Sequence, residues 1–172
     1  MYASVLHEPR PLERRDDRSR FQSGNAEIDD WFHRFAWQNH RAGNARVFVT
    51  TQEPETLGFY ALSMGAVQRS KLPDALKPSQ RPEPCPVLLL ARLAVDQRAQ
   101  GRGIGAALLK DALLRAYKLS NEVGFAALLV HCANDQAREF YLSQSSHFVP
   151  CPGAENHLML PLRALREFID AL

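Results

Sequence analysis

The chain has 172 residues, 45% of them hydrophobic and 23% charged, which is enough apolar material for one packed core but hardly for two. We therefore expect a single domain over residues 1–172. Its net charge of only +2 at pH 7 excludes the strongly basic class of nucleic-acid-binding proteins, so any such contact must rest on local patches. The sequence shows no apolar run of the roughly 18 residues that span a membrane, which favours a cytoplasmic protein without a membrane partner. The three cysteines (Cys85, Cys132, Cys151) include no CxxC pair, so we expect free thiols and no metal.

The first half of the chain predicts an irregular segment, a helix and a hairpin. Residues 8–24 carry dense mixed charge, which is typical of a surface segment. From Asn25 a helix is expected, because apolar residues from Ile28 to Phe35 recur at i, i+3, i+4 and i+7. Residues 46–51 and 57–67 are rich in β-branched and aromatic side chains and predict two strands joined by a turn.

The second half predicts alternating strands and helices. Residues 68–86 hold five prolines and predict a surface loop that shapes an edge of the substrate site. A buried strand at residues 87–95 then leads through a glycine-rich turn into a helix at residues 104–121. Further expected elements are a strand at residues 125–131, a short helix capped by Asn134, strands near residues 148–149 and 158–160, and a helix from Pro161. This order predicts a mixed α/β sheet.

The glycine-rich turn, QGRGIG at residues 100–105, has the composition of an anion site. Successive backbone N–H groups at a helix start can bind a pyrophosphate, and glycine allows close approach and positive φ angles. The spacing is neither that of a dinucleotide-binding turn nor that of a P-loop. It matches the Q/R-x-x-G-x-G/A signature of the GNAT N-acetyltransferases, with Gln100, Gly103 and Gly105 at the fixed positions. The chain therefore resembles this superfamily.

The resemblance implies the GNAT acyl-CoA N-acyltransferase fold, in which a mostly antiparallel central sheet, flanked by helices, splays open at the acetyl-CoA site. Acetyl-CoA is then the acetyl donor, and no metal takes part. The implied acetyl-CoA-binding residues are Leu93, Ala94, Val95, Gln100, Gly101, Arg102, Gly103, Ile104, Gly105, Ala106, Asn134, Ala137 and Phe140.

Tyr141 is the expected catalytic acid, because Phe140 and Tyr141 stand where the superfamily places its F-Y pair. The released thiolate has a conjugate acid of pKa roughly 8.5, and a tyrosine of pKa about 10 can protonate it. The alternative is a ring that only packs in the core. After Tyr141 the chain departs from the family pattern, since a glycine is missing and the connection to Phe148 is about two residues longer. This change can move the wall beside the tyrosine.

No carboxylate stands out as a general base. Glu83, Asp96 and His131 are the possible ones, each with a solvated or structural role as the alternative. A lysine amine of pKa about 10.4 would need a base, whereas an α-amine of pKa about 7.7–8 is already neutral in roughly a tenth of molecules at pH 7. An α-amine acceptor is therefore favoured.

Larger blocks narrow the resemblance to the GNAT toxins of bacterial toxin-antitoxin pairs. The blocks are residues 21–30, 43–49, 58–67, 90–96 and 157–162. Such toxins acetylate the amino group of aminoacyl-tRNA, are neutralised by a ribbon-helix-helix antitoxin and commonly form homodimers. The resemblance implies the same acceptor, partner and assembly here, with Trp31, Trp37 and the strand near Leu158 as candidates for the dimer interface.

Four arginines are candidate tRNA contacts: Arg34, Arg41, Arg46 and Arg92. Residues 33–46 contain no acid, so they can form a local basic surface, although a merely solvated helix face is the alternative. Two other functions remain open. One is acetylation of a small-molecule amine or a protein lysine, and the other is non-catalytic acyl-CoA binding. The basic segments argue against the first, and an intact turn together with Tyr141 argues against the second.

Overall fold

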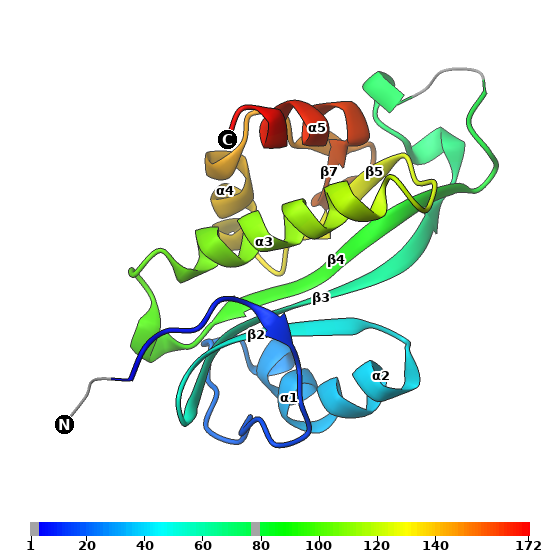
Figure 1. Cartoon of the computed structure of the whole chain (residues 1–172). Coiled ribbons are helices and arrows are strands. Elements are labelled where there is room, and N and C mark those ends of the chain that lie inside the picture. The colour runs from blue at the N-terminus through cyan, green and yellow to red at the C-terminus, as the bar shows by residue number, and fades with distance from the viewer. Residues whose placement is uncertain (1–3, 77–79) are drawn as a thin grey trace. The chain divides into compact units, whose positions relative to one another are not determined.

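The computed structural model describes residues 4–76 and 80–172, which form two compact units. The first unit comprises Met1–Ser63 and Arg92–Ala112, and the second comprises Met64–Ala91 and Leu113–Leu172. Three elements labelled in Figure 1 contribute residues to both units: strand β3 (Glu55–Val67), strand β4 (Cys85–Val95) and helix α3 (Ile104–Leu119).

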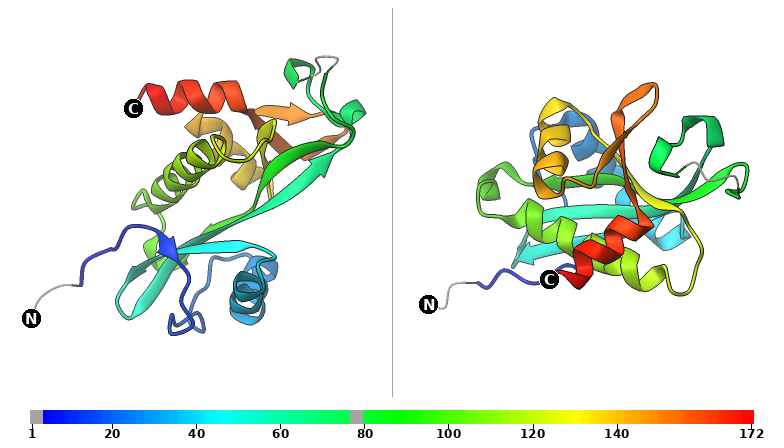
Figure 2. Two further views of the ribbon diagram at one scale, coloured as in Figure 1. Left: turned by 45° about the vertical axis from the view of Figure 1, so that its right-hand side comes forward. Right: turned by 90° about the horizontal axis from the view of Figure 1, so that it is seen from above.

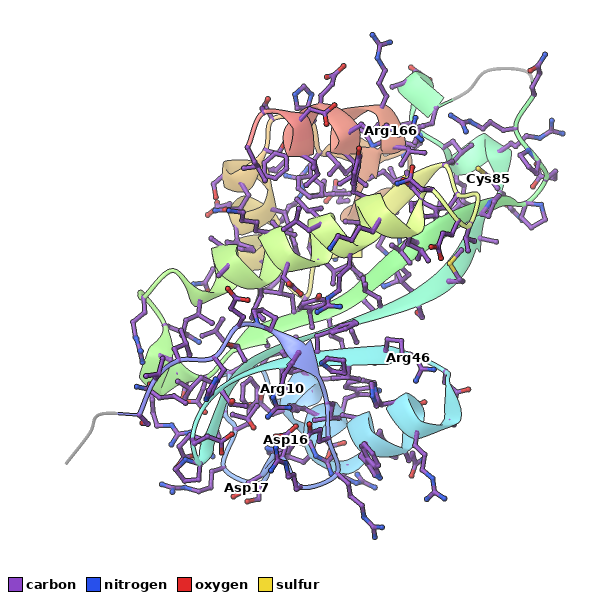
Figure 3. All side chains as sticks on the ribbon, in the orientation of Figure 1. Arg10, Asp16, Asp17, Arg46, Cys85 and Arg166 are labelled. Atoms are coloured by element: carbon purple, nitrogen blue, oxygen red, sulfur yellow. The ribbon has the colours of Figure 1, made fainter. Side chains whose placement is uncertain are left out.

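The sheet of the first unit has the order β1-β2-β3-β4. Strands β2 (Arg46–Gln52) and β3 (Glu55–Val67) pair antiparallel from Arg46 and Leu62 to Gln52 and Glu55, which confirms the predicted hairpin. The segment at residues 8–24 is irregular, as expected, except that β1 (Arg10–Pro11) pairs with β2. A two-pronged ion pair between Arg10 and the buried Asp16, with N–O distances of 2.7 and 2.8 Å, holds this segment in place (Figure 3).

Helices α1 (Ala26–Arg34) and α2 (Ala36–Ala42) follow this segment in the first unit. The Asn25 side chain caps α1 by accepting a hydrogen bond from the Ile28 N–H at 3.1 Å. The predicted apolar stripe is confirmed, since Phe32 is fully buried and its ring lies 4.1 Å from that of Phe59. The sequence pattern did not show the break at Phe35, which ends α1 and precedes α2.

Helix α3 (Ile104–Leu119) confirms the helix predicted at residues 104–121 and ends two residues earlier. An apolar row at every fourth residue is buried: Ile104, Leu108, Ala112 and Ala116. Close packing on β3 depends on Gly58. A Cβ at this position would lie only 2.8 Å from Cδ1 of Leu108. The absence of a side chain at Gly58 therefore lets the helix that starts at the glycine-rich turn lie directly on the strand.

The sheet of the second unit has the order β4-β5-β7-β6. Strand β4 (Cys85–Val95) pairs parallel with β5 (Ala127–His131), and β7 (Ala154–Pro161) pairs antiparallel with both β5 and β6 (Val149–Cys151). Helix α4 (Asp135–Gln144) precedes the β6–β7 hairpin, and α5 (Leu162–Asp170) follows it, as the orange and red ribbons of Figure 2 show. The predicted mixed α/β fold is confirmed.

The parallel pairing between β4 and β5 is short and stops before β4 ends. Its three pairs run from Leu88 and Leu128 to Leu90 and Val130, whereas β4 continues to Val95. A strand that runs on beyond its last pair with the neighbour agrees with the splayed sheet that the resemblance implied.

The proline-rich stretch is more ordered than a plain loop. It contains two 3-10 turns at Arg69–Lys71 and Asp74–Leu76, and residues 77–79 lie outside the described residues. Strand β4 begins at Cys85, two residues earlier than predicted, because Pro86 is tolerated at the start of a strand.

Among residues 4–76 and 80–172, no helix is long and apolar enough to cross a membrane. No three metal-ligating side chains gather there. The three cysteines are buried and unpaired, in agreement with the expected free thiols.

Candidate active site

The glycine-rich turn has an unusual backbone and an open front. Gly101 and Gly103 have φ angles of +81° and +78°, in the left-handed region that favours glycine. A Cβ at either position would meet no heavy atom within 4 Å, so conformation and not packing selects glycine here. Helix α3 begins at Ile104, and the first N–H groups of a helix have no partner within it. The turn can therefore hold an anion against a helix start.

The Gln100 side chain fixes this turn. Its Nε2 donates hydrogen bonds to the carbonyl oxygens of Val95 and Ser23, both at 3.0 Å. These bonds join the end of β4 to the segment before α1 and give the Gln100 side chain a structural role in the turn. The Val95 carbonyl, an expected pantetheine contact, is thus already one acceptor in the turn.

Asp96 lies just before the same turn and links it to the segment before α1. Its side chain is 1% exposed and accepts hydrogen bonds from the N–H groups of Arg98 at 2.8 Å and Gln22 at 3.0 Å, and from Nε of Arg98 at 2.9 Å. Burial opposes ionisation, but the bonds from Arg98 and Gln22 outweigh it and lower the pKa of Asp96. A carboxylate with these partners is structural and is a poor general base.

Two other side chains near the turn have assigned partners. The Arg98 guanidinium also reaches Glu55 at 3.3 Å, so it is committed to acids within the protein. The exposed Arg102 guanidinium donates two long hydrogen bonds to Oε1 of Gln52, both at 3.4 Å. Of the two, Arg102 can more easily turn toward a phosphate.

Tyr141 lies in a different setting, inside the second unit. It sits on α4, which Asn134 caps by accepting a hydrogen bond from the Ala137 N–H at 2.8 Å. The Tyr141 side chain is 3% exposed, and its ring lies 5.3 Å from that of Phe140 and 5.8 Å from that of Phe148. Phe148 therefore still forms a wall beside the tyrosine despite the longer connection.

The surroundings of Tyr141 keep its hydroxyl protonated. Burial raises the pKa of Tyr141 far above its ordinary value, and the neighbouring Cys132 adds to the rise. Burial likewise raises the pKa of the Cys151 thiol in the same unit, to about 11. Burial therefore favours the neutral form of both groups.

The two remaining base candidates differ. Glu83 is exposed and paired with Arg69 at 3.1 Å, which supports its solvated role. His131 instead stacks on His157, with ring centroids 4.1 Å apart and planes 14° from parallel. Sequence reasoning missed this pair, because it depends on the β5–β7 register, which places His131 opposite His157.

The four candidate tRNA-binding arginines all belong to the first unit. Arg34, Arg41 and Arg46 are exposed on α1, α2 and β2, and Figure 3 shows Arg46 where β2 begins beside α2. Arg34 pairs with Asp30 at 3.3 Å, and Arg46 donates to the His40 carbonyl at 2.9 Å. These three can offer charge to a large polyanion.

Arg92 differs from the other three. Its guanidinium lies 4.2 Å above the ring of Trp31, and burial lowers its pKa. A stacked arginine can still bind a phosphate with its edge.

The candidate residues for a dimer interface belong largely to the cores of the two units. Trp31 and Trp37 pack partly buried against the core of the first unit. Leu158 is fully buried in β7, so its side chain belongs to the core of the second unit.

Residues 43–144 match the acetyltransferase (GNAT) domain family. The chain therefore belongs to the GNAT acetyltransferase family, as the spacing of the glycine turn predicted. The tRNA-acetylating toxin of Mycobacterium tuberculosis (strain ATCC 25618 / H37Rv) is 40% identical over 161 residues, which cover 94% of this chain and 95% of the toxin.

Two solved structures share this architecture over nearly their whole length. AtaT complexed with acetyl-methionyl-tRNAfMet superposes with a TM-score of 0.84 and 28% identity, covering 96% of this chain and 99% of AtaT. A tyrosine-to-phenylalanine mutant of AtaT, bound to the C-terminus of the antitoxin AtaR and acetyl-CoA, gives a TM-score of 0.79 and 26% identity, with coverage of 96% and 99%. The narrower resemblance to GNAT toxins is thereby confirmed.

Proposed function

We propose that this protein transfers acetyl from acetyl-CoA to the α-amino group of aminoacyl-tRNA in the cytoplasm, and so blocks translation as the toxin of a toxin-antitoxin pair. The observation that carries the proposal is the 40% identity to a tRNA-acetylating toxin over 94% of the chain. That span holds the glycine turn and the buried tyrosine, the two features that the chemistry needs.

In this proposal the turn binds the donor. The N–H groups of residues 101–106 bind the pyrophosphate, because Gly101 and Gly103 leave open space before the helix start. Arg102 adds a positive charge that is only weakly engaged within the protein. Backbone groups of Leu93, Ala94 and Val95 and the side of α4 at Asn134, Ala137 and Phe140 follow the pantetheine arm.

Tyr141 supplies the proton that completes the transfer. The neutral amine attacks the thioester carbonyl, a C–N bond forms, and the C–S bond then breaks to release a thiolate. The Tyr141 hydroxyl protonates that thiolate, and the proton lost by the new amide nitrogen restores the balance. Because burial raises the pKa of Tyr141, its hydroxyl carries the proton that it gives in this proposal.

The acceptor is favoured by charge and by amine basicity. Three exposed arginines, Arg34, Arg41 and Arg46, contact the tRNA backbone in this proposal, and Arg92 contacts it from its stacked position on Trp31. An α-amine is partly neutral at pH 7, so it demands less of a general base than a lysine does.

Similarity to the GNAT toxins also suggests two protein partners, an antitoxin and a second copy of this chain. We propose that a ribbon-helix-helix antitoxin neutralises this toxin. The structure of an AtaT mutant bound to the antitoxin AtaR supports an antitoxin partner, whereas the ribbon-helix-helix type follows only from the resemblance to GNAT toxins. We also propose a homodimer, which would double each basic surface and compensate for a net charge of only +2. Light scattering of the purified protein measures the second proposal directly.

The proposed function is tested by following labelled acetyl from acetyl-CoA into a pool of charged tRNAs, with deacylated tRNA and a lysine peptide as parallel acceptors. Label on charged tRNA alone is the expected result. Label on the peptide would instead indicate a protein acetyltransferase, and acetyl-CoA binding without transfer to any amine would indicate a binding module.

A further inference from the structure

A stack of planar groups connects Arg92 to the core of the first unit. Phe59 is fully buried in β3, and the Trp31 ring of α1 stacks with it, with centroids 6.1 Å apart and planes 17° from parallel. The Arg92 guanidinium of β4 lies 4.2 Å above the same tryptophan ring. Because the core holds Trp31 in place, the ring fixes the orientation of the guanidinium.

Arg92 carries a charge that has no acidic contact in the part of the chain that the structure describes. Its guanidinium forms no ion pair or hydrogen bond there, and Glu27 acts on it only at a distance. Arg34 also lies over a ring, that of Phe35 at 4.9 Å, but it pairs with Asp30. A half-buried charge without a partner is unfavourable, and an anionic ligand relieves this cost. Arg92 is therefore suited to a ligand from outside the chain.

A guanidinium stacked on a ring offers a ligand two kinds of contact. Its edge donates paired hydrogen bonds to a phosphate, and its other face can stack on a nucleobase. In double-stranded RNA the faces of the bases are covered by their neighbours, so a duplex offers Arg92 a phosphate but no base to stack on. A single strand offers both. The environment of Arg92 therefore fits single-stranded RNA better than a duplex.

The place of Arg92 in the chain suits the end of the tRNA that carries the amino acid. Arg92 follows Leu90, the last residue of β4 that pairs with β5, by two positions. In the proposed function the next three residues, 93–95, follow the pantetheine arm. At a rise of about 3.3 Å per residue, Arg92 lies within about 10 Å of Val95 along the strand. RNA held at Arg92 would thus be held beside the acetyl donor.

We propose that Arg92, held on Trp31, binds the single-stranded 3′ end of charged tRNA, with a nucleobase on its free face and the adjoining phosphate at its edge. Trp31 is a positioning residue that fixes the plane of the guanidinium. This inference rests on the proposed function. It goes further by adding base stacking to the backbone contact of Arg92 and by naming the part of the tRNA that is bound.

The test measures binding of two RNA probes, a single strand that ends in CCA and a duplex with the same number of phosphates. Arg92→Lys keeps the charge but has no planar group. It should raise the Kd for the single strand at least about fivefold, through loss of base stacking, and change the Kd for the duplex less than about twofold. The slope of log Kd against log salt should stay the same. Arg92→Gln should also lower this slope, by about 0.7 for the single strand.

Tryptophan fluorescence gives a second measurement, which a purely structural role would not change. The sequence contains two tryptophans, so Trp37→Phe leaves Trp31 as the sole one. In this background the single strand should change the emission of Trp31, and Arg92→Lys should reduce that change.

Two controls and a check of folding complete the design. Arg163→Lys makes the same exchange at an exposed position of α5 and should leave both Kd values within about twofold. Trp31→Phe keeps a ring beneath the guanidinium, so it should retain more affinity for the single strand than Trp31→Leu. Equal melting temperatures show that the compared variants are folded.

Three results would overturn the assignment. An unchanged Kd of Arg92→Lys for the single strand would reduce Arg92 to a point charge. An equal loss on both probes would indicate backbone contact without stacking. Unchanged emission of Trp31 would place the RNA elsewhere. The proposed function fails separately, if the wild-type protein leaves charged tRNA unacetylated, and the binding measurements would then still decide the role of Arg92.

Discussion

The glycine turn of the first unit and the site of Tyr141 in the second unit differ in which groups they present. The turn presents exposed backbone groups, and the second site presents a buried side chain. Gly101 and Gly103 are exposed and act through their backbone, which short-range bonds from Gln100 and Asp96 hold in shape. In the proposed function Tyr141 acts through its side chain, which is buried beside residues such as Phe148. The proposed donor-binding turn therefore depends mainly on residues close to it in sequence, whereas the proposed proton-transfer site depends on burial by the whole unit.

Of the variants that test this difference, Tyr141→Phe is expected to have the largest effect on activity. Loss of the hydroxyl removes the proton donor but keeps the ring, so kcat should fall by about 100-fold or more. The KM for acetyl-CoA should change little, as steady-state kinetics can measure. Tyr117→Phe on α3 serves as the matched tyrosine control. A Tyr141→Phe enzyme with normal kcat would reduce this residue to core packing.

Gly103→Glu probes the turn and has a matched control in Gly43, the left-handed cap of α2. Both glycines have nearly the same φ, +78° and +79°, and open space around a Cβ. Each substitution should cost about 1–2 kcal/mol of stability. Only Gly103→Glu should weaken acetyl-CoA binding, by roughly 100-fold, through the loss of two charge-assisted contacts of about 1.5 kcal/mol each. Calorimetry measures the affinity, and equal losses in both variants would contradict the assignment.

A smaller effect is expected from the basic surface. The double variant Arg41→Gln and Arg46→Gln should raise the Kd for charged tRNA about fivefold, at roughly 0.5 kcal/mol per exposed charge. The slope of log Kd against log salt should fall by about 2. The control pair is Arg163→Gln and Arg166→Gln on α5, where Figure 3 labels Arg166. An equal change in both pairs would show a non-specific charge effect.

Asp96→Asn should affect stability more than chemistry. Its carboxylate has a lowered pKa, so the stability it contributes is present above the ordinary value of 3.8 and is lost as pH falls through the folded value. The variant should lose about 1–3 kcal/mol at pH 7, and the difference should narrow below about pH 4. Urea denaturation at several pH values measures this, with the exposed Asp170→Asn as control. If the difference in unfolding free energy between the two proteins did not change with pH, ionisation of Asp96 would not contribute to stability.

The same contrast explains what could be predicted from the sequence. The helix that begins after Asn25, the cap at Asn134 and the helix from Ile104 follow from patterns within a few residues, and the structure confirms them. The bond from Gln100 to Ser23 joins residues 77 positions apart. The stacking of His131 on His157 likewise needs the register of two strands, which no local pattern contains.

The most direct test of the central claim is the chemical identity of the acetylated product. Charged tRNA is treated with the protein and acetyl-CoA, digested with ribonuclease, and its terminal nucleoside is analysed by mass spectrometry. The account predicts an aminoacyl adenosine that carries one acetyl group on its α-nitrogen. An acetyl group on a nucleobase or ribose, or an unmodified aminoacyl adenosine, would contradict it.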